Sequence, residues 1–238
     1  MKICILTGAG ISAESGIKTF RDTNGRWNDY DVSEVATPQG FYKNPQLVLD
    51  FYNSRREEVS SAEPNDAHFA LAKLQSDPNH EVTLVTQNVD NLHERSGSSN
   101  VIHMHGALSE SLCRKCGNIT YANMVMKLTD VCDECNHPAL RPNIVWFGEM
   151  PYSMDYIEDK IRDCDIFVSI GTSGTVYPAA GFVSIAKKKA RAYTIEINLY
   201  PSYENKLFAE HMEGPATETV KMFVDKVING EYDYLKSC

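Results

Sequence analysis

Short apolar runs without polar alternation recur along the chain and predict strands that are buried on both faces of a parallel sheet. The first run is Ile3-Cys4-Ile5-Leu6, and a glycine turn ends it. We expect further strands at residues 81–85, 101–102, 165–170 and 192–197. The chain should therefore fold as an α/β protein around this sheet.

Apolar residues at helical spacing predict the helices between these strands. We expect helices at residues 32–60, 64–74, 154–161, 176–189 and 215–227. In the second of them, His68 lies beside the apolar stripe of Ala67, Leu71 and Leu74. No other residue of a metal-ligating type stands at a helical spacing from His68, so we interpret it as structural.

A glycine turn follows the first strand. Gly8-Ala9-Gly10 precedes a helix start at Ser12, and Gly8, Gly10 and Ala13 fit the spacing G-x-G-x-x-G/A. Such a turn lets the backbone approach the phosphates of a nucleotide, and free N–H groups at the helix start attract them. A tight turn that packs and binds nothing stays open as the alternative.

The segment after this turn departs from an ordinary dehydrogenase. A dinucleotide-binding unit places its second strand within roughly 30 residues, whereas residues 19–25 are polar and rich in turn formers. A long loop after a phosphate turn is more often a functional cover than a connector. Gly171-Thr172-Ser173-Gly174, a second glycine and hydroxyl turn, follows the strand at 165–170 and is again typical of phosphate binding.

Polar side chains crowd the run from Thr86 to His93, directly after the strand at 81–85, where open α/β sheets bind ligands. Asn88 or Asp90 could cap the following helix, but that alternative does not explain the other polar side chains of the run. His103 and His105, at i and i+2 after the next strand, are expected to face the same side. They could ligate a metal, or one could act as a general base, and its place at the turn favours His105.

Composition narrows the possible functions. The chain has 238 residues and a net charge of −9, which argues against binding to nucleic acid or anionic membranes. No apolar run reaches about 18 residues, so we expect no membrane span. Met1 leads directly into the first strand, so we expect no signal peptide and a cytoplasmic protein.

Four of the seven cysteines form two pairs, and a reducing compartment suits this pattern better than a disulfide framework. Cys113-x2-Cys116 and Cys132-x2-Cys135 are separated by 15 residues, and four thiolates complete a tetrahedral zinc site. A closed shell of four cysteines leaves no open position on the metal. The zinc should therefore be structural and should fold a small insert with little core of its own.

In combination, these features resemble the sirtuin family. The matching stretches follow the family's order along the whole chain: GAGISAESGIKTFRD (8–22), TQNVDNLH (86–93), HG (105–106), CRKC (113–116), CDEC (132–135), GTSGTVYPAA (171–180) and INL (197–199). Lys18 is a departure, because the family usually has proline at this position.

The resemblance implies an NAD-consuming protein-lysine deacylase that releases nicotinamide and O-acyl-ADP-ribose. NAD would be the co-substrate, acylated lysines of other proteins the partners, and one zinc ion per chain structural, in a monomer. The fold would be a Rossmann-like parallel sheet with a small domain, made of a helical module and a four-cysteine zinc ribbon. The NAD-binding domain would comprise residues 1–31, 83–108 and 140–238, and the small domain residues 32–82 and 109–139.

The resemblance also implies roles by position. His105 would be the general base, because the ordinary pKa of histidine, about 6.5, lies near working pH. Asn88 would orient the ribose, Asp90 the nicotinamide carboxamide, and Phe20 would keep water from the reacting carbon. The residues that would bind the cofactor are Gly8, Ala9, Gly10, Ser12, Ala13, Phe20, Arg21, Asp22, Trp27, Gln87, Asn88, Val89, Asp90, Gly171, Thr172, Ser173, Asn198, Leu199 and Ala216. The residues that would pair with the substrate peptide, together with the region of Val176, are Val145, Phe147 and Gly148.

Tyr52 and Arg55 predict the acyl preference. They stand at i and i+3 of a predicted helix, so both can point the same way. A guanidinium binds a carboxylate bidentately and a tyrosine hydroxyl adds a donor. Since this spacing also resembles the sirtuins that remove acidic acyl groups, we expect desuccinylase and demalonylase activity beside deacetylase activity. Two alternatives stay open: Arg55 could pair with Glu58 on a solvated face, or Arg56 could reach the same side as Tyr52.

Two functions of other classes fit parts of the sequence. One is a non-catalytic binding module, in which a zinc ribbon is attached to a nucleotide-sensing domain. The acidic charge and the polar strand ends argue against it. The other is an NAD-dependent protein ADP-ribosyltransferase, which the same polar loops could serve.

Overall fold

The main sheet is built from the predicted apolar runs. The computed structural model describes residues 1–18, 26–27 and 30–237. Every strand pair of this sheet is parallel, in the order β11-β10-β9-β1-β4-β5. Its strands are β1 (Lys2–Thr7), β4 (Glu81–Thr86), β5 (Ile102–His103), β9 (Ile166–Ile170), β10 (Tyr193–Asn198) and β11 (Glu210–Glu213). The predicted strands are confirmed, whereas β11 is an addition, because its one buried residue, Met212, makes no apolar run.

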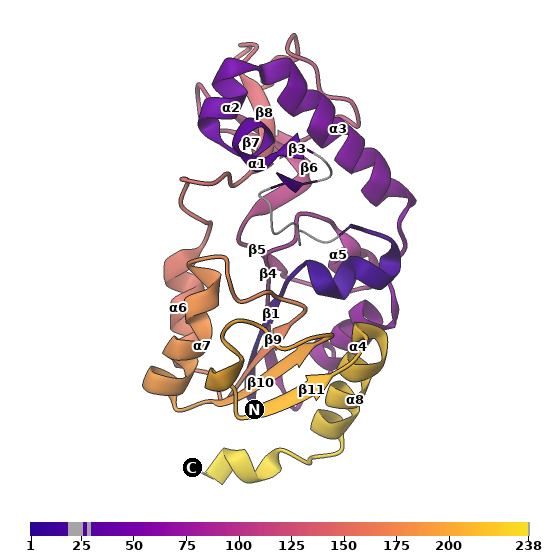
Figure 1. The fold of residues 1–238 in the computed structure, drawn as a ribbon, viewed down its shortest axis with the longest axis vertical. Coiled ribbons are helices and arrows are strands. Elements are labelled where there is room, and N and C mark those ends of the chain that lie inside the picture. The colour runs from indigo at the N-terminus through magenta and orange to yellow at the C-terminus, as the bar shows by residue number, and fades with distance from the viewer. Residues whose placement is uncertain (19–25, 28–29, 238) are drawn as a thin grey trace.

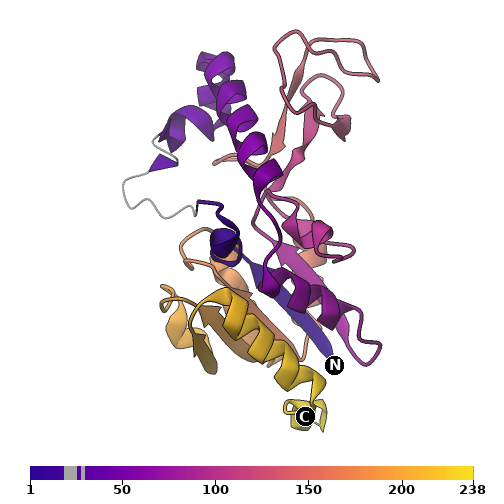
Figure 2. The same cartoon turned by 90° about the vertical axis from the view of Figure 1, so that its right-hand side faces the viewer.

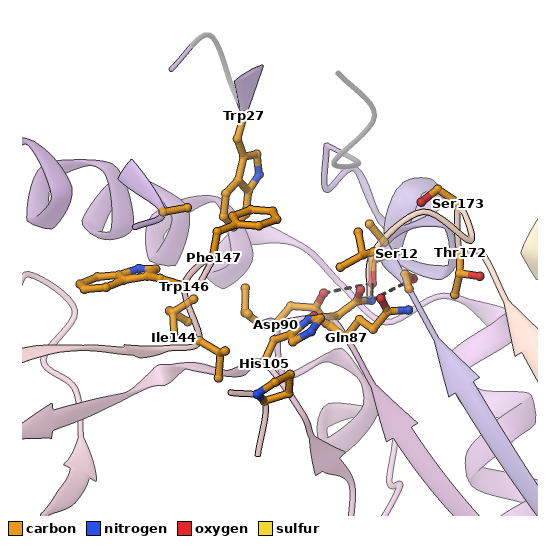
Figure 3. A pocket seen from close by; sticks show the side chains of 18 of the residues that line it. Ser12, Trp27, Gln87, Asp90, His105, Ile144, Trp146, Phe147, Thr172 and Ser173 are labelled. Carbon is orange, nitrogen blue, oxygen red and sulfur yellow. Dashed lines mark hydrogen bonds between the residues drawn. The ribbon is translucent and has the colours of Figure 1, made fainter. Parts of the chain in front are cut away.

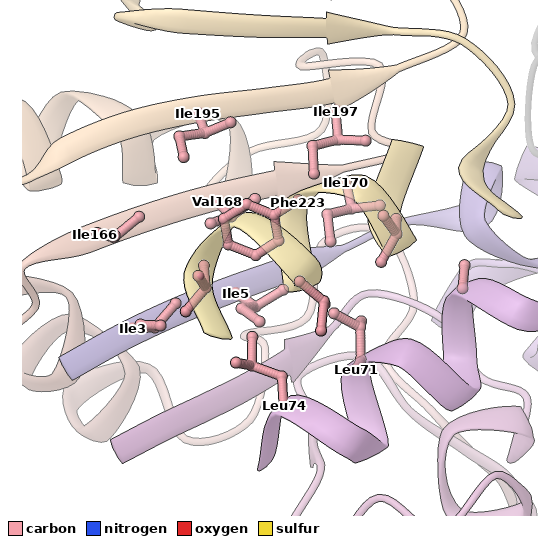
Figure 4. Packing of buried hydrophobic residues seen from close by; sticks show 14 of the residues in the cluster. Ile3, Ile5, Leu71, Leu74, Ile166, Val168, Ile170, Ile195, Ile197 and Phe223 are labelled. Atoms are coloured by element: carbon pink, nitrogen blue, oxygen red, sulfur yellow. The ribbon is translucent and has the colours of Figure 1, made fainter. Parts of the chain in front are cut away.

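Two helical layers cover the sheet, and alternate residues of β1 face them. Ile3 and Ile5 share a core with α4 (Asp66–Gln75) and α8 (Ala216–Ile228), part of which Figure 4 shows. Cys4 and Leu6 point to the opposite face, against α6 (Met154–Arg162) and α7 (Phe182–Ile185). In Figure 1 the two helix pairs lie on opposite sides of the sheet. The Rossmann-like three-layer arrangement is therefore confirmed.

The helix predicted at 176–189 begins later than expected. The segment starts with the 3-10 turn η2 (Ala179–Gly181), continues as α7, and ends in the π-helical turn η3 (Ala186–Ala190). Pro178 explains the late start, because a proline disfavours helical geometry in the preceding residue. Four further short elements complete this part of the chain: η1 (Ala9–Ser15), α5 (Leu92–Arg95), η4 (Asn205–Leu207) and η5 (Asp233–Ser237).

A second, smaller unit lies beyond one end of the main sheet, and we call it the small domain (Figures 1 and 2). It combines a helical module with an antiparallel sheet in the order β7-β6-β8, next to a hairpin of two short strands. Its elements are β2 (Arg26–Trp27), β3 (Tyr30–Asp31), α1 (Val32–Val35), α2 (Pro38–Lys43), α3 (Pro45–Ser61), β6 (Gly106–Cys113), β7 (Ile119–Tyr121) and β8 (Leu140–Ile144).

The segment predicted to be helical at 32–60 is helical, but the chain divides it into three helices, α1, α2 and α3. Thr37 and Asn44 each precede a proline and adopt non-helical geometry. Their side chains accept the backbone N–H groups of Gly40 and Leu47. Each break is therefore a helix start with a side-chain cap and proline at the first helical position.

The domain division proposed from the sequence needs several changes. The strands β2, β3 and β8 and the first residues of β6 were assigned to the domain of the main sheet, but they are elements of the small domain. Residues 32–82 were assigned to the small domain, but Ala67, Leu71 and Leu74 of α4 lie in the core of the main sheet. The apolar stripe predicted this helix correctly, yet a stripe alone does not say which sheet it covers. We therefore propose that the helical module ends with α3 and that α4 belongs to the NAD-binding domain. Among the described residues, no helix combines the length and the apolar character that crossing a lipid bilayer requires.

Candidate functional site

A cavity of about 250 Å³ lies between the main sheet and the small domain, beyond the carboxyl ends of β1, β4 and β9. Figure 3 shows side chains from these strand ends on one side and Trp27, Ile144, Trp146 and Phe147 on the other. The predicted site residues that line the cavity are Gly8, Ala9, Gly10, Ser12, Trp27, Tyr52, Arg55, Gln87, Asn88, Val89, Asp90, His105, Val145, Phe147, Gly148, Gly171, Thr172 and Ser173.

Other predicted residues lie elsewhere. Ala13, Asn198, Leu199 and Ala216 are outside the lining of this cavity. Asn198 still reaches the site indirectly, because its side-chain amide donates to the carbonyl of Thr172 at 2.7 Å and so supports the second glycine turn. The predicted cofactor residues Phe20, Arg21 and Asp22 fall outside the described residues.

The two glycine turns touch each other at the cavity wall. The N–H of Gly10 donates to the carbonyl of Gly171 at 2.9 Å, and the N–H of Gly8 donates to the carbonyl of Ile170 at 2.9 Å. A Cβ atom on Gly10 would stand 2.6 Å from the Cα of Gly171, so only glycine permits this approach. The predicted helix start at Ser12 is a 3-10 helix, η1, rather than an α-helix. Bare backbone from two turns fits the pyrophosphate of a dinucleotide.

Ser12, Asn88 and Asp90 form a buried hydrogen-bond network beneath these turns (Figure 3). The Ser12 hydroxyl donates to Asp90 at 3.1 Å and accepts the side-chain amide of Asn88 at 3.2 Å. That amide also donates to the carbonyl of Gly8 at 3.1 Å. Asp90 also accepts the backbone N–H of Leu92, the first residue of α5. The N-cap of this helix is Asn91, so the predicted cap at Asn88 or Asp90 is one residue or more too early. Burial raises the pKa of Asp90 above its ordinary value.

His105 enters the cavity from the turn after β5. Its Nδ1 lies 3.1 Å from the carbonyl oxygen of Gln87. A carbonyl can only accept, so Nδ1 carries the proton and Nε2 keeps its lone pair. The next residue, Gly106, has a φ of +77°, and a Cβ there would stand 1.9 Å from the carbonyl of Asn143. Burial lowers the pKa of His105, which favours the neutral imidazole.

The other two histidines considered from the sequence have structural partners. His103 lies outside the cavity lining; its ring contacts the carbonyl of Asn88 at 3.2 Å and the carboxylate of Glu94 at 2.7 Å. His68 is buried in α4 and accepts the N–H of Asn65 at 3.3 Å in a capping box. The structural interpretation of His68 is confirmed, and within the described chain neither histidine belongs to a metal-binding cluster.

Tyr52 is fully buried in α3, and its hydroxyl accepts the indole N–H of Trp146 at 3.0 Å. Trp146 is fixed in turn by Arg141, whose guanidinium carbon lies 4.1 Å from the indole centroid, and by Glu149, which accepts the Trp146 backbone N–H. Because the Trp146 N–H occupies an acceptor site of the Tyr52 hydroxyl, the Tyr52 proton is left for an acceptor in the cavity. Burial raises the pKa of Tyr52, so that proton is retained.

The two neighbouring arginines of α3 point to different places. Arg55 lines the cavity, 5.8 Å from the Trp27 ring centroid, and also pairs with Glu58. Arg56 donates to the carbonyl of Leu108 at 2.7 Å and therefore faces the antiparallel sheet of the small domain. Arg56 is thus removed as the rival for Tyr52. The pairing of Arg55 with Glu58, the other alternative, is present together with the cavity position.

Several lining residues were not predicted individually, although Trp146 and Val176 lie in the two stretches that were expected to bind the peptide. Trp146 stands between two predicted peptide-binding residues, and its indole N–H is visible only once Tyr52 is placed beside it. The strand β8 ends at Ile144, after which Val145 donates its N–H to the carbonyl of His105 at 2.9 Å. The lining residues that were not predicted individually are Ile17, Lys18, Ala36, Ile144, Trp146, Glu149, Pro151, Val176 and Tyr177.

The four paired cysteines come together at the end of β6. Their sulfur atoms all lie within 4.8 Å of one another, with Cys113 and Cys135 at 3.6 Å and Cys116 and Cys132 also at 3.6 Å. Tetrahedral zinc with Zn–S bonds of about 2.3 Å sets sulfur atoms about 3.8 Å apart. The predicted four-cysteine cluster is confirmed, and its geometry fits a zinc ion.

We expect one zinc ion per chain, and we expect Cys113→Ser to destabilise the small domain. Cys113 and Cys132 are buried, so an empty cluster would leave polar thiols where the module has few apolar residues. Zinc content by mass spectrometry and thermal unfolding measure both effects. A metal-free preparation with unchanged melting temperature and activity would contradict a structural role.

Comparisons with known proteins agree with this geometry. A model of the Sir2 family matches residues 8–178. An NAD-dependent protein deacylase of Salmonella typhimurium is 52% identical over 232 residues, covering 96% of this chain and 85% of that protein. One of Caulobacter vibrioides is 51% identical over 232 residues, covering 96% of this chain and 97% of that protein.

Solved structures share the fold. A mutant Sir2 homologue with ADP-ribose has a TM-score of 0.88 at 39% identity, over 97% of this chain and 93% of that one. A Sir2 homologue with NAD has a TM-score of 0.86 at 40% identity, over 96% and 90%. Sir2Tm with a propionylated peptide has a TM-score of 0.78 at 28% identity, over 97% and 93%. Since the glycine turns, the polar strand ends and the cysteine pairs all lie within the residues that the family model matches, this chain belongs to the Sir2 family.

Proposed function

We propose that this protein is an NAD-dependent protein-lysine deacylase that releases nicotinamide and O-acyl-ADP-ribose. One cavity unites two touching glycine turns, a buried polar network and an imidazole with a free Nε2, and this observation carries the proposal. Relatives that are named NAD-dependent protein deacylases support it, as do Sir2 complexes with NAD and with a propionylated peptide.

The cofactor would lie against the carboxyl ends of β1 and β9. When bound, NAD supplies a ribose carbon that the acyl oxygen attacks as nicotinamide leaves. Gly8, Gly10 and Gly171 would approach the phosphates with bare backbone, since a side chain at Gly10 would collide with the opposite turn. Asn88 and Asp90 would orient the ribose and the carboxamide, because Ser12 holds both side chains in place.

His105 would act as the general base. The Gln87 carbonyl holds the Nδ1 proton, so the imidazole presents the lone pair of Nε2 to the cavity. That nitrogen would remove the proton of a ribose hydroxyl after nicotinamide has left, and burial favours its neutral state. The base is thus oriented by the same polypeptide stretch that supplies Asn88 and Asp90.

The acyl group would enter beside Tyr52 and Arg55. A succinyl or malonyl group ends in a carboxylate. This carboxylate can accept hydrogen bonds from both the Arg55 guanidinium and the Tyr52 hydroxyl. Trp146 leaves that Tyr52 proton free, as described above. Val145, Phe147 and Gly148 would contact the peptide backbone, and they line the same cavity as Arg55. We therefore propose activity on acidic acyl groups as well as on acetyl-lysine of partner proteins.

The test is incubation with NAD and a mixed panel of acylated peptides, followed by mass spectrometry. Free lysine peptide with nicotinamide and O-acyl-ADP-ribose is the expected result, which makes the reaction an acyl transfer to ADP-ribose. ADP-ribosylated protein without free lysine would indicate a transferase of the other class. Neither product would indicate a binding module without catalysis.

A further inference from the structure

Arg55 is an unusual guanidinium, because it is buried yet only partly paired. It is 3% exposed, and its Nε has no hydrogen-bond partner among the described residues. Among the described residues that line the cavity, there is one arginine, Arg55, and one lysine, Lys18. The side chain of Lys18 is exposed, whereas that of Arg55 is buried. Arg55 is therefore the main positive charge that an acidic acyl group could meet inside the cavity.

The carboxylate of Glu58 already forms an ion pair with the Arg55 guanidinium. Its Oε2 pairs with Nη1 of Arg55, one helical turn away in α3. Its Oε1 accepts the backbone N–H of Lys18 at 3.3 Å, which fixes the carboxylate beside the cavity. Glu58 is not a residue of the cavity lining, so its carboxylate pairs with Arg55 without occupying the cavity itself. The carboxylate thus compensates a buried cation when no substrate is bound.

An acyl carboxylate would approach a guanidinium that is already neutralised. Two carboxylates on one arginine repel each other, and the repulsion is weakly screened where the guanidinium is buried. We propose that Glu58 is a specificity-determining residue, which competes with the acyl carboxylate for Arg55 and so weakens binding of succinyl and malonyl groups relative to acetyl. This inference rests on the proposed function, in particular on Arg55 as the carboxylate-binding residue.

Glu58→Gln tests the inference. Glutamine keeps the size and the acceptor oxygen for the Lys18 N–H but removes the charge. We expect kcat/KM for a succinyl-peptide to rise about 3- to 5-fold relative to that for the acetyl-peptide, the scale of one partly exposed ion pair. The gain should appear in KM rather than kcat, because the acyl terminus is remote from the reacting bond. An unchanged or lower succinyl-to-acetyl ratio would overturn the proposal.

Glu57→Gln is the matched control. Glu57 is exposed on the same turn of α3, so its replacement removes the same charge without touching Arg55. An equal gain in this variant would show a general charge effect and overturn a specific role for Glu58. In an Arg55→Met background, Glu58→Gln should bring no gain, since Glu58 acts through Arg55. A gain that persists there would also overturn the proposal.

The Arg55→Met variant alone separates this inference from the proposed function. If Arg55→Met lowers succinyl activity but Glu58→Gln leaves the ratio unchanged, the role of Glu58 fails and the acidic-acyl activity stands. If Arg55→Met leaves succinyl activity unchanged, the acidic-acyl part of the proposed function fails, and the role of Glu58 fails with it.

Discussion

His105→Ala should abolish deacylation while the protein stays folded and still binds NAD. The imidazole is oriented by the Gln87 carbonyl and lines the cavity, so we expect its loss to remove the proton acceptor and little else. A positioned general base is typically worth 10²–10⁴-fold in rate. Steady-state deacylation measures the loss, and calorimetric titration with NAD measures binding.

His103→Ala is the matched control for this experiment. Its ring pairs with Glu94 outside the cavity, so we expect a milder loss. Turnover of His105→Ala above about one per cent of the parent would move the base to another residue. An equal loss in both variants would undo the choice of His105 over His103.

The pH profile of the parent enzyme gives an independent check. A general base works only when it is neutral, so activity falls as the pH drops through its pKa. Burial lowers the pKa of His105 below the ordinary value of about 6.5. We therefore expect the acidic limb of kcat/KM below that pH, and a limb well above it would contradict this assignment.

Local sequence patterns were sufficient to predict those elements that depend on a single feature, such as an apolar run, a helical spacing or a cysteine spacing. Apolar runs such as Ile3 to Leu6 predict buried parallel strands, because no polar residue interrupts them. The face of α8 with Val220, Phe223 and Val224 follows from helical spacing, and these residues are buried. The cysteine spacing predicts its cluster because a tetrahedral metal site needs two tight pairs.

Other features depend on partners that are distant in the sequence. The sequence of β6 shows no regular alternation of apolar residues. Its pairing with β7 and β8, beside the cysteine cluster, could therefore not be predicted from a local pattern. The breaks at Thr37 and Asn44 had a local sequence signal, a capping residue directly before a proline. In the prediction, the helical spacing of apolar residues over the whole segment outweighed this signal. The direction of Arg55 and Arg56 could not be predicted, because helical spacing permits either one to accompany Tyr52.

Arg55→Met should lower kcat/KM for a succinyl-peptide by 10²-fold or more, about the scale of a lost charge-assisted interaction. Methionine keeps much of the buried volume but removes every donor and the charge. The acetyl-peptide should be nearly unaffected, since its acyl group carries no carboxylate. Parallel kinetics with the two peptides measure the ratio, which does not depend on the active fraction of the enzyme.

Arg56→Met is the matched control for the loss of one buried arginine from α3. Arg56 binds the carbonyl of Leu108 and the side chain of Asn53, so its loss should weaken the small domain while the succinyl-to-acetyl ratio stays constant. Thermal unfolding distinguishes this structural effect from an effect on specificity. If Arg55→Met lowers activity on both peptides equally, Arg55 supports the fold or the cofactor side of the cavity, and the proposed acidic-acyl preference is wrong.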